Sequence, residues 1–307
     1  MSPEEVRAIA PKTITKAQRE SFFEQGFLHL EGAIPRAWVA RLNGALEEIL
    51  ERSRSVKASD RNFVLESKSA ATESRVRRLN HAADNHPVFW DFFSSKDSVL
   101  PDIVVDLIGP DVKFRESMIN FKLAKGGEEV KWHQDTSYMY TNDSPVIVCI
   151  NFKDVSMEQG PLVAIPGSHK LGQLNRYDDN GQWAGHISRE DMKKVDLSTA
   201  QALPGPAGSV TVLHHYVVHG SNQNNSDINR ALLVAGYDAG DSLAIRPTSM
   251  VNQYTGYFVR GRQPSHVRLE AANLRLPPDW TQPQHLRHAM SGIVFGDNAP
   301  AGRETAM

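Results

Sequence analysis

Two histidines and one aspartate have the residue types and spacing of a metal site. His133 and Asp135 are separated by one residue in the segment WHQD, and His219 follows far downstream at the end of a valine-rich run. Two imidazoles and one carboxylate can occupy a single face of an octahedral metal ion. The remaining coordination positions would then stay open for a cosubstrate and dioxygen.

The spacing of His133 and Asp135 fits an extended segment. Side chains two residues apart project to the same face of a strand, whereas Trp132 and Gln134 face the opposite way. The second imidazole must come from another strand, which predicts a role for His219. An H-x-D triplet alone is weak evidence, and the alternative is a solvent-facing His133 with Asp135 as a helix N-cap.

Other histidines compete for the ligand role. On a strand, His215 shares a face with Val217 and His219, whereas His214 faces away. His215 could therefore line the pocket. Four further histidines have no suitably spaced carboxylate and are interpreted as surface or loop residues: His81, His86, His169 and His186.

Arg230 could anchor an anion beside this metal site. It begins the strand-like run ALLVAGY, after the turn 220–229. A hairpin would bring Arg230 back beside the strand of His219, where its guanidinium could bind a carboxylate through two hydrogen bonds and Ser221 could donate another. The alternative is an arginine on the hairpin exterior, paired with Asp238 or Asp241.

In their order and spacing, these segments resemble the phytanoyl-CoA dioxygenase family of iron(II)- and 2-oxoglutarate-dependent oxygenases. The resemblance covers roughly residues 15–240, and the residues beyond add nothing diagnostic. The matching segments are FFEQGFLHLEGAI at 22–34, WHQD at 132–135, GPLVAIPGSHK at 160–170, and HGS at 219–221 followed by Arg230.

The resemblance implies a double-stranded β-helix (a cupin-like jelly roll) with flanking helices. It also implies Fe(II), the cosubstrate 2-oxoglutarate and O2. His133, Asp135 and His219 match the family's iron ligands. The expected cosubstrate contacts are Arg230 and Ser221 at the distal carboxylate, with Asn120, Lys122 and Trp132 as further cosubstrate-binding candidates.

The expected reaction is oxidation, by default hydroxylation, of an unactivated carbon in a small-molecule metabolite, with release of succinate and CO2. Desaturation, epoxidation, demethylation and ring formation are not distinguished by the sequence. Halogenases of the family carry a small residue in place of the metal carboxylate. Asp135 keeps that carboxylate and argues against halogenation.

The first part of the chain predicts helices. Thr15 and Gln18 form a capping box for a helix that ends at Gly26, before a strand at 27–30. A second helix begins at Pro35 and carries an apolar stripe through 38–50, and a third is expected over 97–108. The polar, basic stretch 51–80 is interpreted as a loop or lid, or as a solvated connection.

The rest of the chain predicts short strands. Glycine, proline, asparagine and aspartate separate apolar or alternating runs, as in a barrel or sandwich. The runs are 112–123, 146–155, 162–165, 209–219 and 231–237. A polar stretch at 171–208 is long enough to be functional or disordered.

We therefore expect an α+β to mainly β protein with one domain over 1–307. Its expected parts are a helical region at about 15–110, a jelly-roll core at about 111–245 and a C-terminal extension at about 246–307. The expected pocket wall includes Trp132, Tyr138, Tyr140, Trp183 and His215. Three arginines could recognise an acidic group or be simply solvated: Arg75, Arg77 and Arg78.

Composition and charge limit the binding partners and the cellular location that we expect. The formal net charge of −2 gives no reason to expect nucleic acid or an anionic membrane. The sequence shows no apolar run long enough to span a bilayer and no apolar core of a signal peptide near its start. The single cysteine, Cys149, excludes an intrachain disulfide and is expected to be a buried structural thiol. A cytoplasmic enzyme is expected, with monomer and homodimer both open.

Two other functions are alternatives to a dioxygenase. A zinc hydrolase could bind its metal through two imidazoles and a carboxylate, but it needs a general base, and the sequence contains no H-E-x-x-H. A non-catalytic sugar- or metal-binding jelly roll would not require the three ligands together with Arg230.

Overall fold

Two antiparallel sheets form the centre of the protein. The computed structural model describes residues 1–66, 76–135, 140–245, 250–270 and 278. In these residues the larger sheet has the order β1-β9-β6-β11-β4-β3-β2, with β12 paired to β4, and the smaller sheet has the order β5-β10-β7-β8. Such a pair of antiparallel sheets is the expected jelly-roll core.

The strands of the larger sheet come from almost the whole length of the chain. They are β1 (Phe27–Leu30), β2 (Phe63–Leu65), β3 (Val76–Asn80), β4 (Val112–Lys122), β6 (Val146–Asn151), β9 (Val210–His214), β11 (Arg230–Ala239) and β12 (Phe258–Arg260). The smaller sheet consists of β5 (Val130–His133), β7 (Leu162–Ala164), β8 (Gln201–Leu203) and β10 (His219–Ser221).

Alternation along β6 explains how the larger sheet buries both faces. Ile147 and Cys149 point toward the smaller sheet and belong to the apolar cluster between the sheets. Val146, Val148 and Ile150 point the other way, into the cluster under the helices. Burial raises the pKa of the Cys149 thiol to about 12, which confirms the expected structural thiol.

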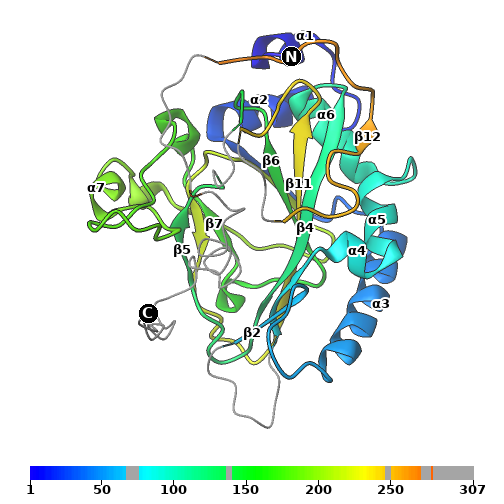
Figure 1. Ribbon diagram of the computed structural model, residues 1–307, viewed down its shortest axis with the longest axis vertical. Helices are drawn as coiled ribbons and strands as arrows, with labels where there is room; N and C mark the ends of the chain where they lie inside the picture. The colour runs from blue at the N-terminus through cyan, green and yellow to red at the C-terminus, as the bar shows by residue number, and fades with distance from the viewer. Residues whose placement is uncertain (67–75, 136–139, 246–249, 271–277, 279–307) are drawn as a thin grey trace, which may run out of the picture.

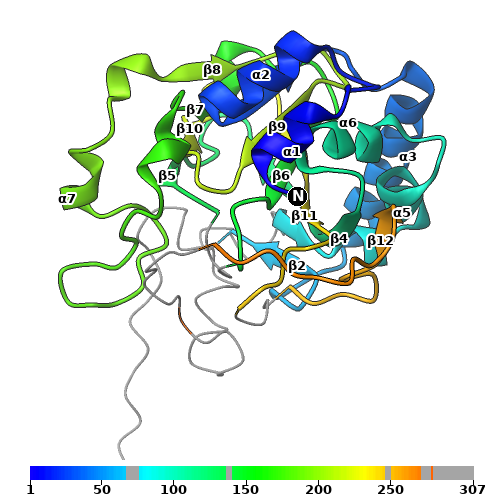
Figure 2. The ribbon, with the colours of Figure 1, turned by 90° about the horizontal axis from the view of Figure 1, so that it is seen from above.

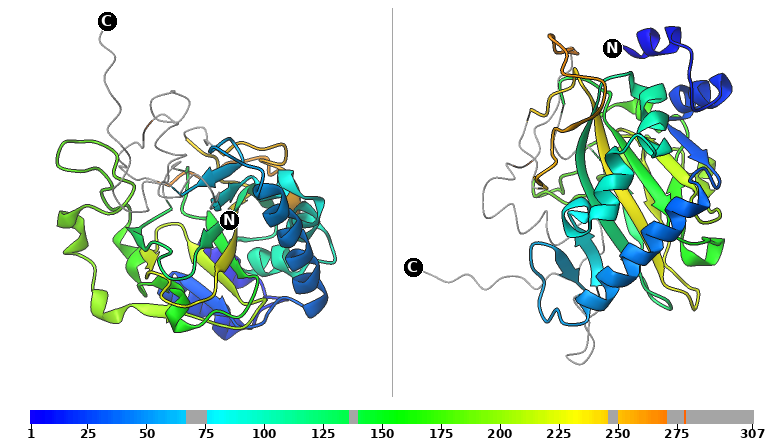
Figure 3. Two further views of the ribbon diagram at one scale, coloured as in Figure 1. Left: turned by 90° about the horizontal axis from the view of Figure 1, so that it is seen from below. Right: turned by 90° about the vertical axis from the view of Figure 1, so that its right-hand side faces the viewer.

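Helices cover the outer face of the larger sheet. Figure 2 shows β5, β7 and β10 on one side, β6, β11 and β4 in the middle, and α3 and α5 on the other side. In Figure 3 (right) the long helix α3 crosses the outer face of the strands. The helices are α1 (Pro3–Ala8), α2 (Lys16–Gln25), α3 (Arg36–Ser53), α4 (Ala82–Asn85), α5 (Pro87–Ser94), α6 (Val99–Ile108) and α7 (Arg189–Met192), with short 3-10 turns at Met157–Gln159, Ser168–Leu171 and Leu197–Thr199.

Helix α2 has the predicted ends. The Thr15 hydroxyl accepts from the Gln18 N–H at 3.1 Å, and the Gln18 side chain accepts from the Thr15 N–H at 2.8 Å. Gly26 ends the helix with φ of +81°, and a Cβ there would lie 2.4 Å from the Nδ1 atom of His169. A glycine is therefore required where the chain turns into β1.

The interpretation of 51–80 as a loop was wrong in part. Strands β2 and β3 lie in this stretch, and β3 pairs with β4 at the edge of the larger sheet. These runs are too short for their periodicity to stand out among the polar residues. Residues 67–75 lie outside the described residues. The helix α5 was also missed, because its eight residues are too few for a helical period to be distinguished from that of a strand.

The predicted run 209–219 divides into two strands of different sheets, β9 and β10. As a result, the hairpin expected to return Arg230 beside the strand of His219 does not form. Strand β10 pairs with β5 and β7, whereas β11 pairs with β4 and β6. Both edges of β10 are already occupied, so the chain crosses to the larger sheet before Arg230.

The polar stretch after β7 forms an insertion, residues 172–200, that carries α7 and projects beside the smaller sheet (Figure 1). None of the helices in the described part of the chain combines the length and apolarity that a bilayer crossing requires.

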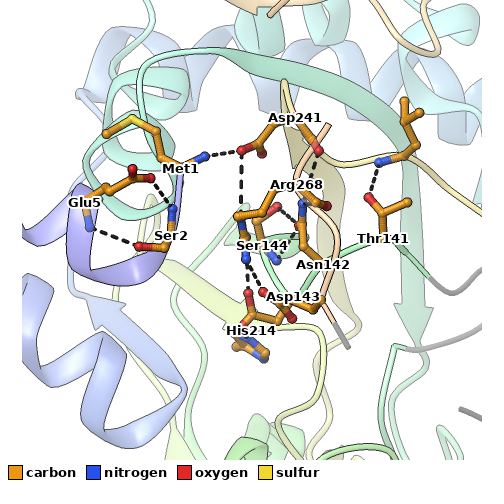
Figure 4. A network of polar contacts seen from close by, with 12 residues as sticks. Met1, Ser2, Glu5, Thr141, Asn142, Asp143, Ser144, His214, Asp241 and Arg268 are labelled. Atoms are coloured by element: carbon orange, nitrogen blue, oxygen red, sulfur yellow. Dashed lines mark hydrogen bonds and ion pairs between the residues drawn. The ribbon is translucent and has the colours of Figure 1, made fainter. Parts of the chain in front are cut away.

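The extension after β11 returns to the barrel through a polar network (Figure 4). The guanidinium of Arg268 lies 3.3 Å from Asp143 and 3.8 Å from Asp241. The amide of Asn142 donates to the backbone carbonyls of Asp241 and Arg268, both at 3.2 Å. These bonds hold residues 141–144, which follow the segment of His133 and Asp135, against the end of β11.

Candidate metal centre

The two candidate imidazoles come from neighbouring strands of the smaller sheet. His219 on β10 is the register partner of His133 on β5, and the centroids of their rings are 4.1 Å apart. Asp135 lies just after β5, where its backbone N–H donates to the carbonyl of His215 at 2.9 Å. The structure thus brings the three residues together, as the sequence predicted.

The donor atoms of these residues converge. The Nε2 atom of His219 lies 3.4 Å from Oδ2 of Asp135, and the Nε2 atom of His133 lies 3.9 Å from Oδ1. Each of the three residues offers one donor atom within 4.8 Å of the others. Within the described residues, this is the one His/Cys/Asp/Glu cluster compact enough to hold a metal ion.

Backbone carbonyls hold both rings in the orientation that a metal ligand needs. Nδ1 of His133 lies 2.8 Å from the carbonyl of Lys131, and Nδ1 of His219 lies 3.0 Å from that of Val217. Each Nδ1 can therefore donate its proton to a carbonyl while the lone pair of Nε2 points toward the carboxylate. These residues fit a divalent transition metal.

The protonation states also suit a metal site. Burial, followed by the neighbouring His219, lowers the pKa of His133 to about 3, so this imidazole is neutral. Burial alone would raise the pKa of Asp135. The two imidazoles, when charged, and the guanidinium groups of Arg176 and Arg115 more than offset this effect, and the pKa of Asp135 is lowered. A neutral imidazole and an ionised carboxylate are the forms that bind metal.

Gln134 connects the ligand segment to its surroundings. Its fully buried side chain donates to the carbonyls of Gly172 at 2.8 Å and Tyr216 at 2.7 Å, and accepts from the N–H of Leu174 at 2.8 Å. The sequence placed Gln134 on the face opposite His133 but gave it no role. A polar side chain between two metal ligands was the available signal.

A second cluster is positively charged. Arg230 and Lys122 are register partners on β11 and β4, and both side chains are buried. Lys122 donates to the Ser221 hydroxyl at 2.7 Å and to the carbonyl of Asn222, and Arg230 donates to the carbonyl of Gly160. Among the described residues, neither cation forms an ion pair with a carboxylate, and Nε of Arg230 has no hydrogen-bond partner.

Burial lowers the pKa values of both cations. Burial, followed by the charge of Arg230, lowers the pKa of Lys122 to about 7, and burial lowers the pKa of Arg230 to about 10. Burying two like charges is unfavourable unless an anion binds between them. The cluster of Arg230, Lys122 and Ser221 is therefore suited to a carboxylate ligand. The exterior position considered for Arg230 is wrong, since Asp238 pairs with Arg115 instead.

The two other residues predicted to bind the cosubstrate are Asn120 and Trp132. Asn120 is also on β4, where its side chain accepts from Nε of Arg78 at 3.0 Å. Trp132 packs with Ile165 and Val218. Alternation along β5 turns it away from the face of His133, and its place in the pocket wall and in the cosubstrate set stays a prediction.

The remaining pocket candidates are distributed as follows. Tyr140 is buried and lies edge-on to His215, with ring centroids 6.0 Å apart. Trp183 lies in the insertion beneath the guanidinium of Arg176. Arg77 and Arg78 are half-buried on β3, so they are not a solvated surface cluster. Tyr138 and Arg75 lie outside the described residues.

The sequence profile of the Phytanoyl-CoA dioxygenase (PhyH) family matches residues 22–232. The chain belongs to this family. The match spans the helices α3 to α6, the ligand segment, His219 and Arg230, and so covers the whole candidate site.

Two curated relatives illustrate the range of this dioxygenase family. A probable alpha-ketoglutarate-dependent hypophosphite dioxygenase from Stutzerimonas stutzeri is 27% identical over 266 residues, which cover 85% of this chain and 91% of that protein. An L-proline trans-4-hydroxylase from Streptomyces griseoviridis is 28% identical over 235 residues, covering 69% and 82%.

A solved structure has the same fold. EctD from S. alaskensis, solved with 2-oxoglutarate and 5-hydroxyectoine, superposes with a TM-score of 0.63 at 22% identity and covers 84% of this chain and 88% of that one. The protein is thus a jelly-roll, non-haem iron dioxygenase that depends on 2-oxoglutarate.

Proposed function

We propose that this dioxygenase hydroxylates an unactivated carbon of a small-molecule metabolite while 2-oxoglutarate is converted to succinate and CO2. The observation that carries the proposal is the presence of two complementary clusters in one barrel. One offers His133, Asp135 and His219 for a metal, and the other offers Arg230, Lys122 and Ser221 for a carboxylate.

In this proposal the three ligands hold Fe(II) on one face, which leaves positions for 2-oxoglutarate and O2. When bound, the iron and the cosubstrate supply the oxidising chemistry. The chain's own contribution is orientation and charge. The carbonyls of Lys131 and Val217 fix the two imidazoles, and Arg230 and Lys122 neutralise the distal carboxylate of 2-oxoglutarate.

Small-molecule hydroxylation has support from relatives. The Streptomyces griseoviridis relative is named for hydroxylation of L-proline, and the Stutzerimonas stutzeri relative for oxidation of hypophosphite. Both names describe small substrates. Asp135 supplies the third ligand, so there is no open position of the kind that halogenation requires.

A zinc hydrolase is less well supported. Such an enzyme would use the triad but would leave two buried cations, Arg230 and Lys122, without a function. The cytoplasmic location and the oligomeric state stay predictions, to be tested by cell fractionation and by light scattering.

The test uses purified protein under anaerobic conditions. Addition of Fe(II) and then 2-oxoglutarate should produce a visible metal-to-ligand charge-transfer band, and zinc in place of iron should not. Exposure to O2 should then release succinate, faster when a substrate is present. Absence of the band with iron fully bound would refute the proposed function.

A further inference from the structure

A cavity away from the metal centre is not used by the proposed function. It lies between the N-terminal helices α1 and α2, the end of α6 and the polar network of Figure 4, and its volume is about 140 Å³. The three metal ligands do not line it, and neither do the residues of the cosubstrate cluster, Arg230, Lys122 and Ser221. A ligand in this cavity would therefore occupy a second site.

Apolar side chains form most of the cavity walls. Five of them are buried in the core: Val6 of α1, Phe22 of α2, Leu107 and Ile108 of α6, and Val146 of β6. An apolar cavity of about 150 Å³ lined by leucine, isoleucine and phenylalanine stays dry and holds one benzene molecule. The volume and the walls of this cavity therefore fit a single six-membered ring.

Two buried side chains hold α1 in place as a wall of the cavity. The guanidinium of Arg19 donates to the carbonyls of Val6 at 3.1 Å, Arg7 at 2.9 Å and Ile9, which end the helix. The carboxylate of Asp106 on α6 accepts three backbone N–H groups from the connection between α1 and α2. Because both attachments belong to the fold itself, α1 keeps its position beside the cavity.

One end of the cavity is polar. The Nδ1 atom of His214 accepts the backbone N–H of Tyr216 at 3.1 Å, so the proton of the neutral ring is on Nε2. Burial lowers the pKa of His214 to about 4, which keeps the ring neutral near pH 7. Figure 4 shows His214 beside Asp143. Nε2 of His214 lies 4.0 Å from Oδ2 of Asp143, too far for a hydrogen bond.

Asp143 is ionised and can accept a further hydrogen bond. Burial alone would raise its pKa, but a hydrogen bond with Glu270 and the positive charges of His214, when protonated, and Arg268 more than offset this effect. The pKa of Asp143 is therefore lowered. The guanidinium of Arg268 lies 3.3 Å from Oδ1. A carboxylate has about four lone-pair sites, so sites remain for a ligand in the cavity.

The spacing of this donor and this acceptor fits a hydroxyl group. An oxygen at hydrogen-bonding distance, about 2.8 Å, from both atoms would see them at an angle of about 90°. The hydroxyl can accept from Nε2 of His214 and donate to Asp143 from this one position. A carboxylate would be repelled by Asp143, and an ammonium group could not accept from His214. A ring that carries a hydroxyl therefore satisfies both ends of the cavity.

We propose that this cavity binds a small phenol, with the ring against the apolar walls and the hydroxyl between His214 and Asp143. The hydroxyl accepts a hydrogen bond from the imidazole and donates a charge-assisted one to the carboxylate. This inference goes beyond the proposed function and does not depend on it, because no residue of the metal centre or of the cosubstrate cluster lines the cavity.

The experiment measures phenol binding to the full chain by calorimetry, in the anaerobic complex with Fe(II) and 2-oxoglutarate. Two ligands of similar size test the hydroxyl. Toluene has no polar group, and anisole accepts a hydrogen bond but cannot donate one. Phenol should bind with one molecule per chain and at least tenfold more tightly than toluene or anisole.

Variants then assign the site. His214→Phe keeps a ring but removes the donor, and should weaken phenol binding at least tenfold. His214→Gln, whose amide retains an N–H donor, should recover part of that loss. Val6→Phe should abolish binding, because the added ring fills the cavity. The matched control is His186→Phe, at a half-buried histidine of the insertion, which should bind phenol as the wild type does.

Three results would overturn the proposal. They are failure of phenol to bind, equal binding of toluene or anisole, and undiminished phenol binding in either His214→Phe or Val6→Phe. The last result would place the phenol elsewhere, for example beside the metal. Circular dichroism shows whether each variant is folded, and if one of these two variants does not fold, the other decides the outcome.

Discussion

His219 lies directly opposite His133 in the antiparallel pair of β10 and β5, with 4.1 Å between ring centroids. This register determines the metal site, because a slip of one residue would turn one imidazole to the other face of the sheet. Asp135 then needs to be only two residues beyond His133 to reach both rings. Two short strands thus position all three donor groups.

Replacement of one ring tests this arrangement. His219→Ala should lower iron occupancy and reduce turnover more than a hundredfold, since loss of partners outside the ligand sphere already costs about 10–100-fold. Metal analysis and succinate release provide the measurements. His186→Ala, a half-buried loop histidine, is the control, and one iron per chain with normal turnover in His219→Ala would contradict the assignment.

Arg230 allows the two clusters to be tested separately. Arg230→Ala should weaken 2-oxoglutarate binding about 10–100-fold, the equivalent of a charge-assisted hydrogen bond of about 1.5–3 kcal/mol. Iron affinity should stay the same, because Arg230 and Lys122 are neighbours on the larger sheet whereas the three ligands belong to β5 and β10. Equal loss of iron and 2-oxoglutarate would show that the arginine supports the fold instead of the cosubstrate.

The depressed pKa of Lys122 predicts a pH dependence of cosubstrate binding. With the site free of cosubstrate the pKa is about 7, and a bound dianion would raise it. Affinity for 2-oxoglutarate should therefore be highest below pH 7. It should weaken as pH rises above 7, by up to about tenfold per pH unit, until the pKa of the complex is passed.

Titrations of 2-oxoglutarate between pH 6 and 9 would measure this effect. Lys122→Met should bind more weakly at pH 6 and show a flatter profile. Lys125→Met, which removes an exposed lysine of the same segment, should keep the wild-type profile. An identical pH profile in wild type and Lys122→Met would contradict the role of this lysine.

The sequence predicted the metal triad well because its evidence is local. Alternation along one strand placed His133 and Asp135 on one face, and the valine-rich run before His219 indicated a second strand. The capping box of Thr15 and the glycine stop at Gly26 likewise depend on adjacent residues, and both are confirmed.

The errors concern pairings between distant segments. Arg230 was expected to return beside His219, but β11 pairs with β4, and this preference is set by partners that no local pattern reveals. The partners of Gln134 depend in the same way on where the insertion and the β9–β10 turn fold.

The partly buried His214 predicts acid sensitivity. Burial lowers its pKa to about 4, against the opposing effect of Asp143. The unfolded chain takes up a proton near pH 6.5 whereas the folded protein does not, so stability is fully present above pH 6.5 and is lost as pH falls toward 4. The loss from this residue is on the order of 1–3 kcal/mol.

Urea unfolding of metal-free protein at pH 7.5 and 5 would measure this loss. His214→Gln, compared with wild type under the same conditions, should lose less stability on acidification, because the substituted side chain does not titrate. Metal-free protein is required because iron binding would add its own pH dependence through the ligands. An equal loss in both proteins would exclude His214 as the source.

Gln134 is a positioning residue whose role can be separated from simple packing. Gln134→Leu keeps most of the volume but leaves the carbonyls of Gly172 and Tyr216 and the N–H of Leu174 without partners. Because these bonds hold the segment between His133 and Asp135, iron affinity should fall about 10–100-fold. The charge-transfer band should shift as well, since the orientation of the ligands changes.

A purely structural role would give a different result. It would lower the unfolding midpoint and leave iron affinity and the band of the folded fraction unchanged. Gln134→Glu provides a graded variant, because its carboxylate still accepts from Leu174 while both donated bonds are lost. If iron affinity decreases from wild type to Gln134→Glu to Gln134→Leu, and stays normal in the exposed control Gln182→Leu, then the insertion and the metal site are coupled through this one amide.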